Sequence, residues 1–268
     1  MNKSFEDYFL KIYQGRWKSI KMALAEKNKQ TERKNLFYSS GSALAESYAM
    51  DPASEIVARA LQPESDQQVL DLCAAPGGKS LVLAEMMSFK SDTWKLPTGE
   101  LIANEMSEGR RLRLVRVLNE YIPKEKRLFI FVKGLDGNQY GLRQPNHFDR
   151  VLADVPCSGE RHLLENPTEL ALWSEKRTKN LSVRQFSLLS SAWLAVKPEG
   201  RIVYSTCSIS PLENDGVVAK LVKKRNPKIL RPDYLNEMDF VEETEFGYQI
   251  LPDTCGFGPM YFSVIEKN

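Results

Sequence analysis

Hydrophobic and polar positions divide the chain into short apolar runs that alternate with longer amphipathic stretches. Each apolar run is bounded by polar or turn-forming residues and predicts a strand. The predicted strands are "VLDLC", "ELIANE", "RLFIFVKG", "FDRVLADVPC" and "RIVYSTCS". Helices are predicted between them, and the last repeats apolar residues at helical spacing: Leu181, Leu188, Leu189, Ala192, Trp193 and Val196. This rhythm predicts a mostly parallel sheet with helices on both faces.

The two ends of the chain depart from this alternation. Residues 1–40 hold nine Lys or Arg against four Asp or Glu, and their aromatic residues recur at helical spacing. They predict one or two basic amphipathic helices whose aromatic side chains pack on the main domain. The segment "EFGYQILPDTCGFGPMYFSVIEKN" has two β-rich runs with no helix between them, which is typical of an antiparallel closing hairpin. We expect a basic helical extension over residues 1–48 and one α/β domain over residues 49–268.

Composition and cysteine spacing argue against several classes of protein. At 268 residues and 42% hydrophobic, the chain can bury one substantial core. The formal net charge is only +2; the basic front fits a polyanionic partner or a solvated surface. Four cysteines lie far apart and two histidines are present, so neither a disulfide framework nor a metal site is expected. Acidic residues follow Met1 and no run of about 18 apolar residues occurs, so we expect a cytoplasmic protein without a membrane span.

Polar or reactive residues follow each predicted strand. Ligands of open parallel sheets bind outside the carboxyl ends of the strands, near the point where strand order reverses. The residues at those ends are Cys73 to Lys79, Glu105, Asp136, Asp154 to Cys157 and Thr206 to Ser208. We expect one pocket to gather these segments. Further along, Glu213 and Asn214 are expected to begin and cap the next helix rather than to contact a substrate.

The loop after the first strand is rich in small residues. It comprises Cys73, Ala74, Ala75, Pro76, Gly77, Gly78 and Lys79, and it fits neither the P-loop pattern nor G-x-G-x-x-G. Small residues still let a ligand approach the backbone closely. Glu105 is placed to accept hydrogen bonds from ribose hydroxyls, and Asp136 from an adenine amino group. Adenosine without phosphates is what S-adenosylmethionine presents, although Glu105 alone would equally fit a surface carboxylate that starts a helix.

Two cysteines are expected at the same edge of this pocket. If the fourth and fifth predicted strands are neighbours, about 4.8 Å apart, Cys157 and Cys207 emerge together. C5 of a pyrimidine is a poor nucleophile, and a thiolate that adds to C6 makes it able to attack a sulfonium methyl group. A second acid or base then assists elimination of the thiol. Asp154 could hold the exocyclic amino group of cytosine, and Lys79 could raise thiolate character or orient the base electrostatically. Cys255 fits a small buried hydrophobe.

Four segments together resemble the NOL1/NOP2/Sun family of RNA cytosine-5 methyltransferases: "LDLCAAPGGKS", "ANEMSEGRRLRL", "LADVPCSG" and "VYSTCSISPLEND". The resemblance covers roughly residues 50–265. It implies a Rossmann-like class I S-adenosylmethionine-dependent methyltransferase fold, α/β, with a mostly parallel seven-stranded sheet and an antiparallel closing strand. It also implies a cofactor site formed by Cys73 to Lys79, Glu105, Asp136 and Asp154.

The same resemblance assigns roles to the two thiols. It implies that Cys207 is the nucleophile and that Cys157 assists product release. DNA cytosine-5 enzymes use the cysteine that follows a proline, which would favour Cys157 as the nucleophile. The assignment therefore rests on the resemblance and not on spacing.

Within the family, "DVPCSGERH" looks most like the short mitochondrial members that act on ribosomal or transfer RNA. Where the family often has "DAPCSGxG", this chain has Glu160, Arg161 and His162, which are expected to alter substrate contacts. RNA choice is expected to depend on residues 1–50, the loop at 158–180 or a partner protein. Ribosomal RNA is the favoured substrate and transfer RNA the next, and the protein is expected to be a monomer.

Three alternative functions compete with this one. An amino-group methyltransferase needs no thiol and usually has an Asp/Asn-Pro-Pro-aromatic turn at the position of residues 154–157. A DNA cytosine-5 enzyme usually carries a long target-recognition segment, for which 268 residues leave no room. A non-catalytic RNA-binding or ribosome-assembly factor of the same fold is opposed by the intact Cys157, Cys207, Asp154 and Lys79.

Overall fold

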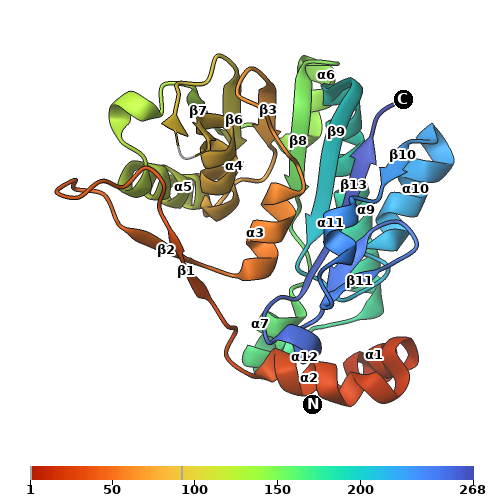
Figure 1. Ribbon diagram of the computed structural model, residues 1–268. Helices are drawn as coiled ribbons and strands as arrows, with labels where there is room; N and C mark the ends of the chain where they lie inside the picture. The colour runs from red at the N-terminus through yellow and green to blue at the C-terminus, as the bar shows by residue number, and fades with distance from the viewer. Residues whose placement is uncertain (1, 92) are drawn as a thin grey trace.

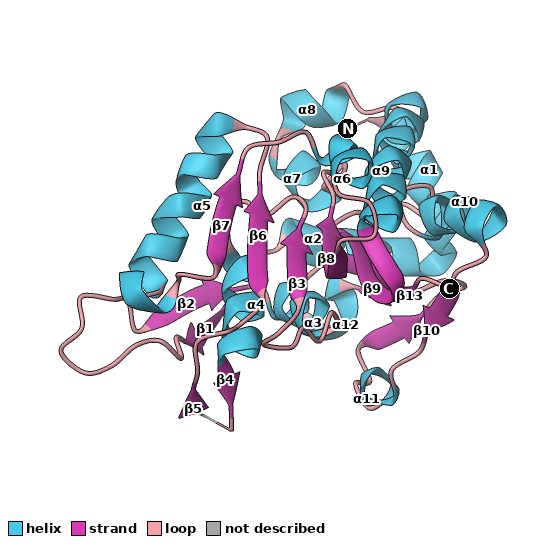
Figure 2. Ribbon diagram, turned by 90° about the horizontal axis from the view of Figure 1, so that it is seen from above, coloured by secondary structure: helices cyan, strands magenta, loops and turns pink. Residues whose placement is uncertain are grey.

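The structure, a computed structural model, describes residues 2–91 and 93–268 (Figure 1). At its centre, five parallel strands lie side by side in the order β9, β8, β3, β6, β7 (Figure 2). Their bounds are β3 Gln68–Asp71, β6 Glu100–Asn104, β7 Ile130–Lys133, β8 Phe148–Asp154 and β9 Val196–Thr206. The chain adds strands on one side of β3 and then on the other. The carboxyl end of β3 is therefore the switch point at which such sheets bind ligands.

Helices cover both faces of this sheet, as the sequence predicts. Successive side chains of a strand point to opposite faces, so Val69 lies in one hydrophobic core and Leu70 in the other. The core around Val69 includes residues of α3 (Pro52–Arg59), α4 (Gly78–Ser88) and α5 (Glu108–Tyr121). The core around Leu70 includes residues of α9 (Glu175–Ala195) and α10 (Asp215–Arg225).

The end of the chain closes the sheet. β13 (Met260–Glu266) runs antiparallel to β9, and β12 (Tyr248–Ile250) pairs antiparallel with β13, which confirms the closing hairpin. β10 (Lys228–Leu230) pairs with a later part of β13, and β11 (Val241–Glu243) pairs with β12. The sheet among the described residues therefore has nine strands where seven were expected. The two extra strands are only three residues long, too short for a hydrophobic alternation to reveal them.

Near the N-terminus, the predicted helices form and pack on the main domain. Their bounds are α1 Lys3–Tyr13, η1 Gln14–Arg16 and α2 Trp17–Ala25. Phe5 and Phe9 of α1 and Trp17 of α2 are buried against Trp173, with the rings of Phe5 and Trp173 edge to face at 5.3 Å. The aromatic residues at helical spacing thus serve packing, as expected.

Residues 26–40 are not helical, so the expectation of helix up to residue 40 was wrong for this segment. β1 (Thr31–Lys34) and β2 (Ser47–Met50) form an antiparallel pair. The side chain of Asn35 donates to the carbonyls of Ala45 and Tyr121, at 2.8 and 2.9 Å, and so fastens this pair to the end of α5. The expected domain boundary at residue 48 falls inside β2.

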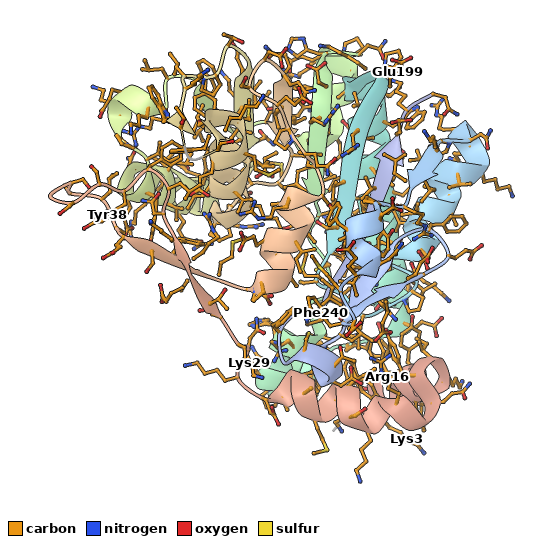
Figure 3. All side chains as sticks on the ribbon, viewed as in Figure 1. Lys3, Arg16, Lys29, Tyr38, Glu199 and Phe240 are labelled. Carbon is orange, nitrogen blue, oxygen red and sulfur yellow. The ribbon has the colours of Figure 1, made fainter. Side chains whose placement is uncertain are left out.

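The remaining elements are short and connect the larger ones. They are η2 Lys124–Lys126, η3 Gly137–Gln139, α6 Tyr140–Arg143, α7 Glu160–Glu165, α8 Pro167–Ala171, α11 Asp233–Asn236, α12 Pro252–Cys255 and the paired β4 Phe89–Lys90 and β5 Thr93–Trp94. Among the described residues, no helix is both long and apolar enough to cross a membrane. In Figure 1, α6 lies at one end of the sheet, while α1, α2 and α7 lie at the end where β8 and β9 finish. In Figure 3, the label of Glu199 marks the end of the sheet near α6, and the label of Arg16 marks the end near α1 and α2.

Candidate active site at the carboxyl ends of the strands

β8 and β9 end side by side, with Asp154 opposite Ser205 in the parallel register. Just beyond these ends, the Sγ atoms of Cys157 and Cys207 lie 2.8 Å apart. The backbone N–H of Cys207 also donates to Cys157 Sγ at 3.3 Å. Both thiols are free. The expected meeting of these two cysteines at one edge of the sheet is therefore confirmed.

The two thiols have different surroundings. Cys207 is exposed and Cys157 is half-buried. The hydrogen bond to Cys207, together with burial, raises the pKa of Cys157 well above its usual range, so Cys157 is held as a thiol. Gly159 adopts a φ of 64°, in the left-handed region that favours glycine, and a Cβ there would lie 3.8 Å from Cys207 Sγ. The turn after Cys157 therefore runs close beside the exposed thiol.

Lys79 and Asp154 form an ion pair next to the thiols. Lys79 Nζ lies 2.8 Å from Asp154 Oδ2, and Ser205 Oγ donates to Asp154 Oδ1 at 2.8 Å. Although burial opposes it, the negative charge and hydrogen bond of Asp154 raise the pKa of Lys79, with a smaller contribution from Cys207. Lys79 therefore stays charged, and the adjacent ends of β8 and β9 bring the four predicted catalytic residues to one edge of the sheet.

Two buried carboxylates hold the cysteine loops together. Glu160 accepts hydrogen bonds from the hydroxyls of Ser158 and Ser208, and Glu213 accepts one from the backbone N–H of Ser158 at 3.0 Å. Neither carboxylate side chain reaches solvent. Burial and the nearby charge of Glu213 raise the pKa of Glu160 to about 7, and burial also raises the pKa of Glu213. Glu160 and Glu213 therefore fix the backbone segments that carry Cys157 and Cys207.

Glu213 and Asn214 were expected to begin and cap α10. Asn214 does occupy the N-cap position, but its side chain makes no capping hydrogen bond, and Glu213 lies before the helix. Glu213 is buried and accepts from the amide of Gln185 at 2.7 Å. Asn214 precedes α10, but its side chain accepts from the hydroxyl of Thr206 at 2.6 Å and donates to the carbonyl of Ser208 at 2.9 Å. Polar residues before a helix can either cap the helix or form a buried hydrogen-bond network with neighbouring loops. The sequence does not distinguish these two roles, because it does not show whether the side chains are buried.

Residues 160–162 were expected to alter substrate contacts, and that stays a prediction; the structure shows what their side chains contact within the chain. Glu160 is buried. Arg161 donates to the carbonyl of Gly258 at 2.9 Å and to carbonyls within residues 23–26, and burial lowers its pKa. Only the side chain of His162 is exposed. Arg161 thus joins the cysteine loop to the end of α2 because a guanidinium can satisfy several carbonyls at once.

A pocket of about 460 Å³ lies at the switch point of the sheet. Glu105 and Asp136 both line it, as the sequence predicts. Glu105 is buried, accepts from the backbone N–H of Ser107 at 2.8 Å and lies 3.4 Å from the guanidinium of Arg110. Asp136 accepts from the backbone N–H of Asn138 at 3.0 Å. The pocket therefore presents two oriented carboxylates to a ligand.

A smaller pocket of about 170 Å³ adjoins the first, since Cys73 lines both. Most of the predicted cofactor loop lines it, together with the ion pair: Cys73, Ala74, Ala75, Pro76, Gly78, Lys79 and Asp154. Gly77 lines neither pocket. Its φ is 123°, and a Cβ there would meet Leu114 and Val117 at 3.1 Å. Gly77 therefore serves the turn and the packing of α5 against the loop.

Asp71 is a site residue that the sequence reasoning missed. It ends β3, is buried and lines the smaller pocket. One carboxylate oxygen accepts from Ser80 Oγ at 2.6 Å, and the other has no partner among the described residues. Burial raises the pKa of Asp71 to about 7. The signal was present, because an acidic residue inside an apolar strand has to be explained by a partner or a ligand.

The two connected pockets fit S-adenosylmethionine. Glu105 and Asp136 supply acceptors for ribose hydroxyls and an adenine amino group. The unpaired oxygen of Asp71 and the charges of Lys79 and Asp154 suit the amino and carboxylate groups of the methionine part. The volume of the larger pocket lies in the range of small-molecule sites.

Comparison with known proteins agrees with this geometry. Residues 58–266 match a family described as 16S rRNA methyltransferase RsmB/F. The 5-cytosine rRNA methyltransferase NSUN4 of Xenopus laevis is 38% identical over 237 residues, which cover 82% of this chain and 56% of that protein. The mitochondrial tRNA (cytosine(34)-C(5))-methyltransferase of Danio rerio is 38% identical over 235 residues, 84% of this chain and 61% of that protein. The chain thus spans little more than half the length of these curated relatives.

Solved structures show the same fold. A methyltransferase homolog protein from Pyrococcus horikoshii has a TM-score of 0.77 at 20% identity and covers 100% of this chain and 96% of its own. NSun6 from Pyrococcus horikoshii has a TM-score of 0.67 at 21% identity and covers 84% of this chain and 54% of its own. The predicted Rossmann-like methyltransferase fold is confirmed, and S-adenosylmethionine is the cofactor of this domain. The chain belongs to the 16S rRNA methyltransferase RsmB/F family, which confirms the resemblance to the NOL1/NOP2/Sun family.

Proposed function

We propose that this protein transfers a methyl group from S-adenosylmethionine to C5 of a cytosine in RNA. The observation that carries the proposal is the pair of Sγ atoms of Cys157 and Cys207, 2.8 Å apart beside the Lys79–Asp154 ion pair. Relatives named as cytosine-5 methyltransferases of ribosomal and transfer RNA support RNA as the substrate.

Cys207 acts as the nucleophile. It is exposed, whereas Cys157 is held as a thiol. The sulfur forms a bond to C6 of cytosine, which makes C5 electron-rich. When bound, S-adenosylmethionine supplies an electrophilic methyl group. Asp154 accepts a hydrogen bond from the exocyclic amino group of the base, because each of its oxygens keeps a second lone pair beside its present bond.

Cys157 assists product release. After methyl transfer, solvent water accepts the proton from C5 and the electron pair of that C–H bond forms the C5–C6 double bond. The bond between Cys207 Sγ and C6 breaks, and its electron pair returns to the sulfur. Cys157 is held as a thiol within hydrogen-bond distance of that sulfur. Its S–H stabilises the departing thiolate, so the second half of the reaction depends on it.

Ribosomal RNA is the first candidate substrate and transfer RNA the second, following the relatives' names. The basic residues within 1–40 provide attraction for a polyanion, and a partner protein contributes to RNA choice. The protein acts as a monomer in a reducing compartment, the cytoplasm. Both proposed roles need free thiols, and an oxidising compartment would link sulfurs that lie this close.

The proposal is tested by mass spectrometry of nucleosides. Ribosomal RNA, transfer RNA and DNA are each incubated with the purified protein and S-adenosylmethionine, then digested. New 5-methylcytosine is expected in an RNA pool, with none from Cys207→Ala. Cys255→Ala is the matched control, because Cys255 lies away from the pockets and its thiol donates to the carbonyl of Leu251 at 3.4 Å; this variant should remain active.

Two outcomes would contradict the proposal. New 5-methylcytosine in DNA alone would assign a different substrate. Full activity of Cys207→Ala would remove the assigned nucleophile. If no pool is methylated although the protein binds both RNA and S-adenosylmethionine, the non-catalytic RNA-binding factor becomes the better account.

A further inference from the structure

A third pocket, of about 340 Å³, opens beside Cys157. One wall is the beginning of α9, where Arg177, Asn180 and Arg184 recur at helical spacing and face the pocket. Trp173 and Leu181 supply apolar surface. None of the described residues that line this pocket is acidic.

The pocket is rich in hydrogen-bond donors that have no acceptor. Arg177 and Arg184 are exposed, and neither guanidinium has an ion pair or hydrogen bond within the part of the chain that the structure describes. Trp173 is buried, and its indole N–H also has no partner there. Two guanidinium groups without an ion-pair partner among the described residues are suited to a phosphate, which accepts several hydrogen bonds at once.

The position of the pocket relates it to the reaction. Leu181 and Arg184 line both this pocket and the larger cofactor pocket, while Cys157 lies at its edge. Neither Lys79 nor Asp154 lines it, so it is not the space in which the target base meets that ion pair. It therefore offers room next to the target base, on the side of Cys157.

We propose that this pocket binds the nucleotide that adjoins the target cytosine, with Arg177 and Arg184 on its phosphodiester and its base against Trp173 and Leu181. This rests on the proposed methylation of RNA. The two arginines are positioning residues: they hold the strand so that C6 of the cytosine reaches Cys207. Because both are exposed, replacing them leaves the fold intact.

The test uses the double variant Arg177→Ala/Arg184→Ala and a short RNA that contains the mapped methylated cytosine. KM for this RNA should rise roughly tenfold or more, as expected for lost hydrogen bonds to a charged group, with a smaller change in kcat. The slope of log affinity against log salt should decrease by about 0.7, the value for one phosphate of a single strand. Arg143→Ala is the control; it removes one positive charge from α6, at the opposite end of the sheet (Figure 1), and should change neither quantity.

A second RNA carries a neutral methylphosphonate at the phosphate next to the target. It should bind the wild-type protein less well than the natural RNA does, and the double variant should not distinguish the two RNAs. Equal KM and salt slope for the double variant and Arg143→Ala would overturn the pocket assignment while leaving the methylation proposal intact. Weaker binding of S-adenosylmethionine with unchanged KM for RNA would assign the arginines to the cofactor instead. Absence of methylation by the wild-type protein would overturn both proposals.

Discussion

Glu160 and Glu213 hold the same residue from two sides. Glu160 accepts from the hydroxyl of Ser158, and Glu213 accepts from the backbone N–H of Ser158 at 3.0 Å. Ser158 follows Cys157, so two buried carboxylates fix the backbone of a proposed catalytic thiol. Two negative charges this close to each other and away from water are costly in free energy. The cost favours the protonated form and so raises the pKa of the pair.

Stability should therefore fall as pH rises past neutrality. The pKa of Glu160 is about 7 in the folded protein and near 4.5 in the unfolded chain, so the folded protein binds the extra proton between these values. The stabilisation is present below about 4.5 and is lost as pH rises through about 7. Urea unfolding at pH 5 and pH 8 measures the fall, which should be smaller for Glu160→Gln. Part of the fall in stability should remain in Glu160→Gln, because the pKa of Asp71 is also raised to about 7. An equal fall in both proteins would contradict the role given to Glu160.

Replacing Cys157 should trap the enzyme on its substrate. Without the thiol 2.8 Å from Cys207 Sγ, the bond between Cys207 and C6 forms but breaks slowly. Cys157→Ala with RNA and S-adenosylmethionine should give a slower band that survives denaturing electrophoresis and disappears on ribonuclease treatment. The double variant Cys157→Ala/Cys207→Ala should give none, and its retention of the band would move the covalent bond to another residue.

Mild oxidation should link Cys157 to Cys207. Two thiols transfer two electrons and two protons to hydrogen peroxide, which yields one disulfide and two molecules of water. The sulfurs must approach from 2.8 Å to about 2.05 Å, a small movement for an exposed loop. Intact-mass and peptide mass spectrometry should find the linked pair with two hydrogens fewer, and dithiothreitol should restore methylation. Peroxide-treated Cys207→Ser should show no such link, and linkage of Cys73 to Cys255 instead would contradict the geometry.

The N-terminal helices should contribute to the stability of the whole chain. Phe9 is fully buried and stacks on Trp17 with ring centroids 5.1 Å apart. Phe9→Ala should lower the free energy of unfolding by roughly 3–5 kcal/mol, as measured by urea titration. Leu10→Ala is the neighbouring control, since 52% of that side chain is exposed, and it should cost less than about 0.5 kcal/mol. Equal effects would mean that α1 does not unfold together with the main domain.

The sequence predicts the parallel sheet well because its strands are buried on both faces. Val69 and Leu70 enter different cores, so an apolar run reveals the strand without any alternation. The β1–β2 pair could not be found in this way. Its strand "TERK" is polar and mostly exposed, and the pair depends on Asn35, whose partners lie as far away as Tyr121.

Part of the candidate site, too, could be predicted from the sequence and part could not. Cys157, Cys207 and Asp154 follow strands, so the rule for parallel sheets brings them together before any coordinates are known. Glu160 begins the short helix α7 and Glu213 lies in a turn, positions at which a carboxylate usually faces water, and only the fold shows that both are buried. The roles of all these residues stay predictions until the variants are measured.

Arg161 has a consequence for the two ends of the chain. Its guanidinium binds carbonyls within residues 23–26 and the carbonyl of Gly258, and it belongs to the helix that follows Cys157. Arg16, which Figure 3 labels, adds ion pairs with Glu242 and Asp253. Segments from the beginning, middle and end of the polypeptide thus meet at the helix that follows Cys157. A fusion partner that strains α2, or a deletion that removes Gly258, would act on the chemistry from a distance by releasing this helix.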